Sequence, residues 1–253
     1  MSVRRERRGR IEIVTLDRPE ARNAIDGDTA WTLSAIFDEL ESDDEVWAVV
    51  ITGAGKAFCA GVDLKAIATE AERIIGAPGG FAGIAQRFFP KPLIAAVNGP
   101  ALAGGFEIVL SCDLAVAAEH ATFGIPEVKR GLMAAAGGLI RLGKRIPLAL
   151  ALEFAMTGDP VDAQRALALG LVNRVVPAEA VLDEAIALAE RICENAPVAV
   201  RLSKRLMIDS LELNEEEAWK RNFALAGEVT QTKDVWEGIA AFAEKRPPVW
   251  QGR

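Results

Sequence analysis

The sequence has few of the residues that build metal centres, disulfide networks and imidazole catalysts. It contains one histidine, His120, and three cysteines, Cys59, Cys112 and Cys193. The cysteine number is odd and no C-x-x-C pair occurs, so neither a disulfide framework nor a zinc site is expected. The single histidine argues against a Ser-His-Asp site, and His120 stands in a segment that is typical of a surface turn.

Long apolar runs and a secretory leader are also missing, which predicts a soluble, cytoplasmic protein. The formal net charge is −7, so nucleic acid is disfavoured as a partner. The basic run between Arg4 and Arg10 is interrupted by Glu6, and we interpret it as a solvated segment that leads into the first strand. No GxxxxGK[ST] phosphate loop occurs. Apolar residues make up 51% of the chain, which predicts a globular protein with a sizeable core.

Strands and helices alternate through the first half of the sequence. Strands are expected at 11–16, 46–52, 93–97 and 113–118, and helices at 28–40, 63–75, 81–89 and 101–111. This alternation indicates parallel β/α units. After about residue 137 helices dominate, with one short strand at 171–176 behind a helix at 162–169.

These patterns divide the chain into two parts. Residues 1–195 are predicted to form a β/α core and residues 196–253 a helical C-terminal region. The helices of the second part carry apolar faces, which need a partner, either the core or another subunit.

Glu107 is the only charged residue between Ala101 and Leu110. An unpaired buried carboxylate is costly or takes up a proton, so such a group serves a salt bridge or a function. Gly104 and Gly105 precede it, and glycines at a helix start let a ligand approach backbone N–H groups that favour an oxyanion. The alternative is that the glycines permit close helix packing and that Glu107 pairs with a structural arginine. The pattern alone favours neither.

Two further segments carry weaker signals. Residues 56–64, Lys-Ala-Phe-Cys-Ala-Gly-Val-Asp-Leu, join a buried strand to a helix, where small residues suit a binding crevice. Taken alone, they are better explained as a plain turn with a free core cysteine. Residues 123–127, Phe-Gly-Ile-Pro-Glu, place Glu127 behind a stiffening proline. Taken alone, Glu127 is better explained as a surface residue paired with Lys129 or Arg130.

Together these segments resemble the enoyl-CoA hydratase/isomerase (crotonase) superfamily along nearly the whole chain. The matching segments are Arg18-Pro19, Asn23-Ala24, residues 57–64, 91–99 and 104–107, residues 123–127, Gly137-Gly138, and Thr157-Gly158 through Gly170-Leu171-Val172. Several independent segments in the right order make a strong signal. The resemblance implies an α/β fold, a crotonase-like spiral of ββα units with a helical C-terminal region. It also implies trimers, often paired into hexamers.

The resemblance implies four catalytic positions. The backbone N–H groups of Val62 and Gly104 would hold the thioester oxygen, each contributing about 3 kcal/mol to the enolate. Glu107 and Glu127, twenty residues apart, would hold a water between them. Glu107 would activate that water for attack on the β-carbon, and Glu127 would deliver a proton to the α-carbon. No metal or redox cofactor is implied.

The same resemblance implies how acyl-CoA binds. Basic side chains should meet the CoA phosphates, and the acyl tail should run toward residues 74–89, where Phe81, Ile84, Phe88 and Phe89 are either pocket wall or core. Alternatively, each basic residue is only a solvated surface charge. The predicted substrate-binding residues are Arg22, Ala60, Asp63, Leu64, Lys65, Phe242 and Lys245.

The expected activity is reversible hydration of a 2-enoyl-CoA. Alternatives are a carnitine-type dehydratase, a double-bond isomerase and a non-catalytic acyl-CoA scaffold. The chain departs from the family at residues 133–136, Met-Ala-Ala-Ala, where Pro-Gly is common, at Leu139, where threonine is frequent, and at Ala103, where a third glycine is frequent. These departures change the shape beside the site and leave the acyl substrate open.

Overall fold

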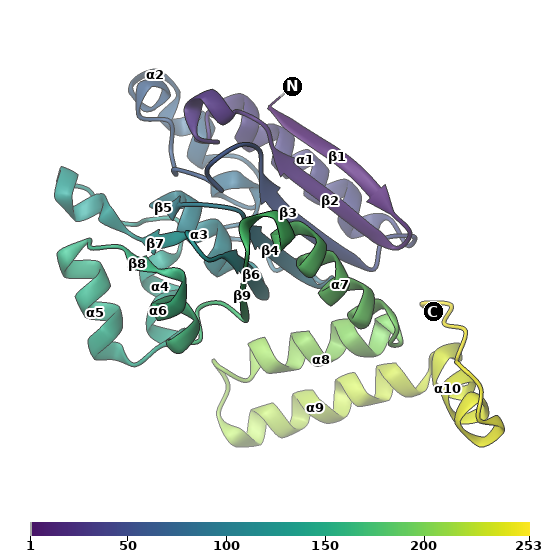
Figure 1. Ribbon diagram of the computed structural model, residues 1–253. Helices are drawn as coiled ribbons and strands as arrows, with labels where there is room; N and C mark the ends of the chain where they lie inside the picture. Colours follow the sequence, from purple (N-terminus) through teal and green to yellow (C-terminus); the bar gives the residue numbers. More distant parts are fainter. Residues whose placement is uncertain (1) are drawn as a thin grey trace.

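The computed structural model describes residues 2–253, and its main feature is a six-stranded sheet with the order β1-β2-β3-β4-β6-β9 (Figure 1). The pairs from β2 to β9 are parallel, and β1 is antiparallel to β2. The strands are β1 Val3–Arg8, β2 Ile11–Leu16, β3 Ala48–Gly53, β4 Leu93–Val97, β6 Leu114–Ala118 and β9 Arg174–Val176.

A second sheet of three short strands lies beside the first. Its order is β5-β7-β8, from Ala101–Leu102, Thr122–Gly124 and Val161–Asp162. Helices lie between most of the strands in the first half of the chain and dominate after about residue 137, as the sequence patterns predict. They are α1 Gly27–Ser42, α2 Leu64–Ile75, α3 Gly104–Ser111, α4 Gly138–Arg145, α5 Leu148–Thr157, α6 Ala163–Ala168 and α7 Val181–Cys193, with single 3-10 turns η1 Pro19–Ala21, η2 Phe81–Gly83, η3 Pro126–Arg130 and η4 Ala178–Ala180.

Three helices complete the chain: α8 Pro197–Asp209, α9 Glu215–Thr230 and α10 Lys233–Glu244. Helices α8 and α9 run side by side, and the group lies apart from the two sheets, with α10 at the end remote from α2 (Figure 1). In the part of the chain that the structure describes, no helix has both the length and the apolar character needed to cross a membrane.

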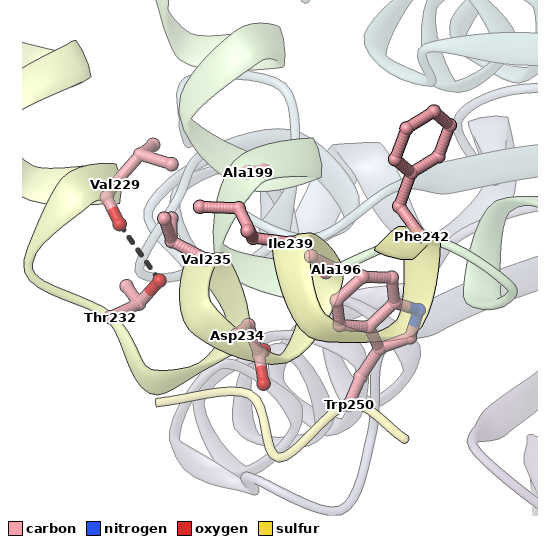
Figure 2. Close-up of a pocket in the computed structure, with 10 residues that line it drawn as sticks. Ala196, Ala199, Val229, Thr232, Asp234, Val235, Ile239, Phe242 and Trp250 are labelled. Atoms are coloured by element: carbon pink, nitrogen blue, oxygen red, sulfur yellow. Dashed lines mark hydrogen bonds between the residues drawn. The ribbon is translucent and has the colours of Figure 1, made fainter. Parts of the chain in front are cut away.

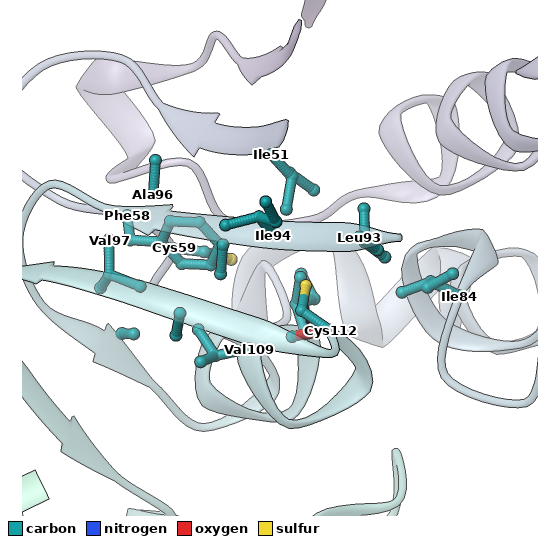
Figure 3. Packing of buried hydrophobic residues seen from close by; sticks show 14 of the residues in the cluster. Ile51, Phe58, Cys59, Ile84, Leu93, Ile94, Ala96, Val97, Val109 and Cys112 are labelled. Atoms are coloured by element: carbon teal, nitrogen blue, oxygen red, sulfur yellow. Dashed lines mark hydrogen bonds between the residues drawn. The ribbon is translucent and has the colours of Figure 1, made fainter. Parts of the chain in front are cut away.

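The core forms where the parallel strands are covered on both faces. Every residue of β3 and β4 is buried, as expected for strands inside a covered parallel sheet. Figure 3 shows Ile51 of β3 and Ile94 of β4 packed together with Phe58, Val109 and Cys112. This core fixes the carboxyl ends of β3 and β4, from which the loops of the site depart.

The basic run near the N-terminus is exposed, as predicted, but it forms strand β1 itself and not a segment that leads into the first strand. Its arginines point from an edge strand and find acidic partners on neighbouring elements. Arg5 and Arg7 both bind Glu12 of β2, at 2.7 Å and 2.8 Å. Glu12 is only 3% exposed, so these two guanidinium groups neutralise a buried carboxylate.

Three predicted elements have different bounds. The helix expected at 101–111 starts only at Gly104, because Ala101 and Leu102 pair with β7. The helix expected at 81–89 is a single 3-10 turn at Phe81–Gly83, since Gly79, Gly80 and Gly83 all adopt positive φ. The last strand begins at Arg174 rather than residue 171. Strands β7 and β8 are too short to leave a periodic signal.

Candidate active site

The loop after β3 is held in place by the buried side chain of Asn23. Its Nδ2 donates to the backbone oxygens of Ala54, Ala57 and Phe58, at 2.9, 2.8 and 3.1 Å, and its Oδ1 accepts from Arg18. Asn23 is 1% exposed and has a positive φ of 56°. Sequence reasoning used this residue only as part of a motif, although it is the main polar anchor of the loop.

The loop then passes directly beside the start of α3. A β-carbon on Gly61 would lie 2.9 Å from the Gly104 nitrogen, and one on Gly105 would lie 2.0 Å from the Cys59 oxygen. Real β-carbons do not approach that closely, so glycine is required at these contacts. The contact places Gly61, the neighbour of Val62, beside the nitrogen of Gly104, so the two predicted oxyanion donors lie on adjacent segments. The glycines therefore permit close packing here, and the oxyanion role of Val62 and Gly104 stays a prediction.

Ala103 is strained at this junction. It is the N-cap of α3 with φ 53° and ψ −130°, a region that residues with a β-carbon rarely adopt. The position therefore suits the glycine that is frequent in the family, and nothing in the structure explains the alanine.

We expect Ala103→Gly to stabilise the protein by about 1 kcal/mol, because relief of strain outweighs the added chain entropy of glycine. That corresponds to a rise in Tm of about 2–4 °C for a chain of this size. Ala101→Gly is the matched control, since Ala101 is fully buried and lacks a positive φ. It should lower the Tm, and equal losses in both variants would disprove strain at Ala103.

Glu107 lies in the first turn of α3 and is 3% exposed. No arginine or lysine forms a salt bridge with it among residues 2–253, so the alternative of a structural arginine partner is wrong. Instead, the Gly138 N–H donates to Oε1 at 2.8 Å. Burial raises the pKa of Glu107 to about 7, with a contribution from the charge of Glu127, while backbone hydrogen bonds and Arg141 oppose the rise. Such a group exchanges protons near neutral pH.

Glu127 lies in η3, near enough to Glu107 for its charge to act on that carboxyl. Its Oε2 is buried and has no hydrogen-bond partner within the described residues. Burial also raises the pKa of Glu127. The surface pairing considered for Glu127 is not formed, because Lys129 binds Asp159 instead. A buried oxygen without a partner beside a second carboxylate suits a small polar ligand such as water.

Five predicted substrate-binding residues gather on the segments that meet at the loop. The Ala60 N–H donates to the Arg22 oxygen at 3.0 Å, and Val62 pairs with Ile25. The side chains of Arg22, Leu64 and Lys65 are exposed there. Asp63 has structural partners: it caps α2 through Lys65 N–H and binds Arg18 at 3.0 Å.

Phe242 and Lys245 lie elsewhere in the chain. They stand at the end of α10, remote from α2 and the loop (Figure 1). Phe242 is 88% exposed and borders an apolar hollow of about 430 Å³ with Ile239 and Trp250 (Figure 2). Within one chain, α10 therefore lies apart from the loop that carries Ala60, and the role of Phe242 and Lys245 in acyl-CoA binding stays a prediction. The amino-acid sequence around Phe242 and Lys245 gave no information on where α10 packs.

The predicted acyl-tail segment contributes to both core and cavity. Phe81, Ile84 and Phe89 are buried, and Phe81 packs against Gly104. Phe88 instead lines a cavity of about 940 Å³ between the core and α8. Ala136 and Gly137, from the turn that holds Glu107, form part of its wall. The alanines that replace the usual Pro-Gly thus border open space beside the carboxylate.

The acidic residues do not form a metal centre. Within residues 2–253 no group of three or more His, Cys, Asp or Glu residues is arranged to hold a metal ion. Burial raises the pKa of the Cys59 thiol, which lies in the site loop, to about 12. That thiol is therefore not a nucleophile near neutral pH. The chemistry available to the site consists of two carboxyl groups with raised pKa values and backbone N–H donors.

Carboxyl groups with raised pKa values beside backbone N–H donors are the groups that acid–base chemistry on an enolisable substrate requires. The sequence pattern of the family described as enoyl-CoA hydratase/isomerase matches residues 6–253, so the chain belongs to that family. The membership expected from the motifs is thereby confirmed.

Relatives and solved structures agree on the fold. The chain is 44% identical to a carnitinyl-CoA dehydratase of Citrobacter koseri, over 98% of this chain and 97% of the relative. The structure matches enoyl-CoA hydratase from Mycobacterium tuberculosis H37Rv with TM-score 0.96 and 45% identity, covering 100% and 99% of the two chains. It matches carnitinyl-CoA hydratase from Mycobacterium avium with TM-score 0.77 and 45% identity, over the same shares. The predicted α/β crotonase-like fold is confirmed.

Proposed function

We propose that the protein catalyses reversible addition of water to a 2-enoyl-CoA, and that a carnitinyl-type thioester is its preferred substrate. The observation that carries the reaction is Glu107, a buried carboxyl with a pKa of about 7 beside Glu127. Two such groups supply the acid and the base that water addition needs. The names of relatives at 43–44% identity over nearly their whole length support the acyl group. This revises the simple enoyl-CoA substrate that the sequence motifs favoured.

The proposed mechanism assigns one role to each group. In the dehydration direction, ionised Glu127 removes the α-proton, and the electron pair moves onto the thioester oxygen. Backbone N–H groups of Val62 and Gly104 stabilise that oxygen. As the double bond forms, protonated Glu107 gives its proton to the β-hydroxyl, which leaves as water. In hydration the roles reverse: ionised Glu107 takes a proton from water as it attacks the β-carbon, and Glu127 protonates the α-carbon.

Electrostatics also support a cationic acyl group. Carnitine carries its trimethylammonium group one carbon beyond the β-hydroxyl, so the cation would lie near the carboxyl groups that act there. At an effective dielectric constant near 20, opposite charges a few ångströms apart attract by about 4 kcal/mol. A neutral acyl tail lacks this attraction.

The test compares carnitinyl-CoA with 3-hydroxybutyryl-CoA, which lacks only the trimethylammonium group. Formation of the enoyl thioester is followed by absorbance. We expect kcat/KM to be at least about tenfold higher for carnitinyl-CoA, a difference of about 1.4 kcal/mol. If only the neutral thioester were turned over, the proposed reaction would stand, but the proposed preference for a carnitinyl substrate would be rejected.

Two other outcomes would replace the proposal altogether. Tight binding of both thioesters without turnover would make the protein an acyl-CoA scaffold. Migration of the double bond in a 3-enoyl-CoA, without water addition, would make it an isomerase. Isomerases of this type can work with one carboxylate, so the retention of both glutamates disfavours the second outcome.

We further propose that the chain acts as a trimer or hexamer. Large apolar side chains are exposed along the C-terminal helices, and since α10 lies far from the site of its own chain, a role of Phe242 and Lys245 in acyl-CoA binding requires a second copy. Sedimentation at three or six times the 27.0 kDa chain mass tests this, and a monomer would contradict it. The exposed side chains include Met207, Leu211, Trp219, Phe223, Trp236, Ile239 and Phe242.

A further inference from the structure

The guanidinium group of Arg141 lies between the turn before α4 and the backbone of Ala85. Arg141, in α4, donates from Nη2 to the backbone oxygen of Ala85 at 2.6 Å. Its Nη1 lies so close over Gly137 that a β-carbon there would be 2.1 Å away. Gly137 has a φ of 97°, so the turn before α4 adopts a glycine conformation under the guanidinium. The side chain thus clamps this turn against Ala85.

These contacts connect Glu107 with the predicted oxyanion donor. Gly138 follows the clamped glycine and donates its N–H to Glu107 Oε1. Ala85 follows η2, whose Phe81 packs against Gly104. Arg141 therefore joins the turn that holds the carboxylate to the segment that supports Gly104.

The charge of Arg141 is not neutralised by a salt bridge. No carboxylate forms one with Arg141 in residues 2–253. Burial lowers the pKa of Arg141, and the neighbouring Arg145 adds to this, whereas Glu107 opposes it. The charged groups acting on Glu107 are Glu127 from η3 and Arg141 from α4, together with backbone donors of Ala136 and Gly138. Arg141 thus opposes the effects of burial and of Glu127 on that carboxyl.

We propose that Arg141 is a positioning residue for water addition: its contacts hold the Gly137–Gly138 turn, and its charge favours the ionised form of Glu107. The inference rests on the proposed function, since it assumes that ionised Glu107 activates the water. Arg141 itself touches neither water nor substrate in this scheme. It acts on the carboxylate through the turn and through the electric field.

The experiment measures the pH profile of kcat for hydration of crotonyl-CoA in Arg141→Met and Arg141→Lys. Loss of the cation in Arg141→Met raises the pKa of Glu107, so the acid limb should move up by about 1 pH unit. Well below the limb, activity then falls about tenfold, while KM changes by less than about threefold. Arg141→Lys keeps the charge but not the planar fork. This variant should return the acid limb of the pH profile to the pH found for the parent, while kcat stays several-fold below that of the parent.

Arg145→Met is the matched control. Arg145 lies one turn further along α4 and donates to the backbone oxygen of Cys112 at 2.6 Å, without contacting Gly137. Its removal should shift the limb by less than about 0.3 pH unit, because it does not act directly on Glu107. An unmoved limb in folded Arg141→Met, or equal shifts in both Met variants, would overturn the proposal.

A second measurement separates this inference from the proposed function. The Glu107 carboxyl can be titrated by ¹³C NMR in the full chain, with Glu107→Gln used to assign its signal. A raised pKa in Arg141→Met, reversed by lysine, supports the electrostatic role even if no enoyl-CoA is hydrated. If Arg141→Met does not fold, Arg141→Lys provides the test. An acid limb and a Glu107 pKa like those of the parent, together with a reduced kcat, support the proposal. An unchanged kcat overturns it.

Discussion

Glu107→Gln is expected to lower kcat for hydration by about a hundredfold to ten-thousandfold, the range found when a general base or acid is removed. Glutamine keeps the shape and can still accept the Gly138 N–H bond, but it cannot take the proton from water. Binding of a saturated acyl-CoA should persist, since Val62 and Gly104 are untouched. The measurements are kcat by absorbance and the Kd of butyryl-CoA. Retained turnover would exclude Glu107 as the catalytic base.

The same variant should be more stable than the parent at high pH. The pKa of Glu107 is raised by folding, so the folded state holds the proton more tightly than the unfolded chain. The cost of ionising it is absent below about pH 4.5, grows as pH rises, and is complete above about pH 7, where it amounts to about 3 kcal/mol. Glutamine removes that cost. Unfolding at about pH 8 should therefore need more denaturant, and the gain should vanish near pH 4.

Glu127→Gln is expected to lower hydration by a similar factor, about a hundredfold to ten-thousandfold, for a different reason. In the proposed mechanism Glu127 exchanges the proton on the α-carbon, so its loss should block enolate formation. Its buried Oε2 has no partner among the described residues, which means that an amide there loses no existing bond at that atom. Expression should stay close to that of the parent, the Tm near pH 7 should not fall because glutamine has no carboxyl group to ionise, and butyryl-CoA should still bind.

Isotope exchange separates the roles of the two glutamates. Butyryl-CoA cannot lose water, but its α-proton can exchange with solvent through the enolate. In D₂O the parent and Glu107→Gln should incorporate deuterium at the α-carbon, whereas Glu127→Gln should not. NMR of recovered butyryl-CoA provides the measurement. Exchange that depends on Glu107 and not on Glu127 would reverse the assignment.

Several local features were predictable because their causes lie within a few residues of one another. The helix cap at Asp63 and the strand at Leu93–Val97 follow from capping and from a compact apolar run. Glu107 stood out because a charge in an apolar helix needs a reason. Motif order predicted the family and fold, which the comparisons confirm.

Other features depend on contacts between distant parts of the chain, and no local pattern shows them. β1 is a strand because β2 and Glu12 offer it partners, although its sequence resembles a solvated basic run. The sequence around Phe242 and Lys245 did not reveal that α10 lies far from the loop that carries Ala60, because the docking of a helix is determined by tertiary packing.

The sequence by itself predicted the fold family from the order of its motifs, and it predicted the pair Glu107 and Glu127 through the resemblance that those motifs carry. Only the tertiary structure decided how Glu107 is held, because its partner Gly138 is 31 positions away and reaches it through the packing of α4 on α3. It alone revealed the strain at Ala103 and the clamp formed by Arg141. Burial, close approach and the electric field depend on which surfaces meet after folding.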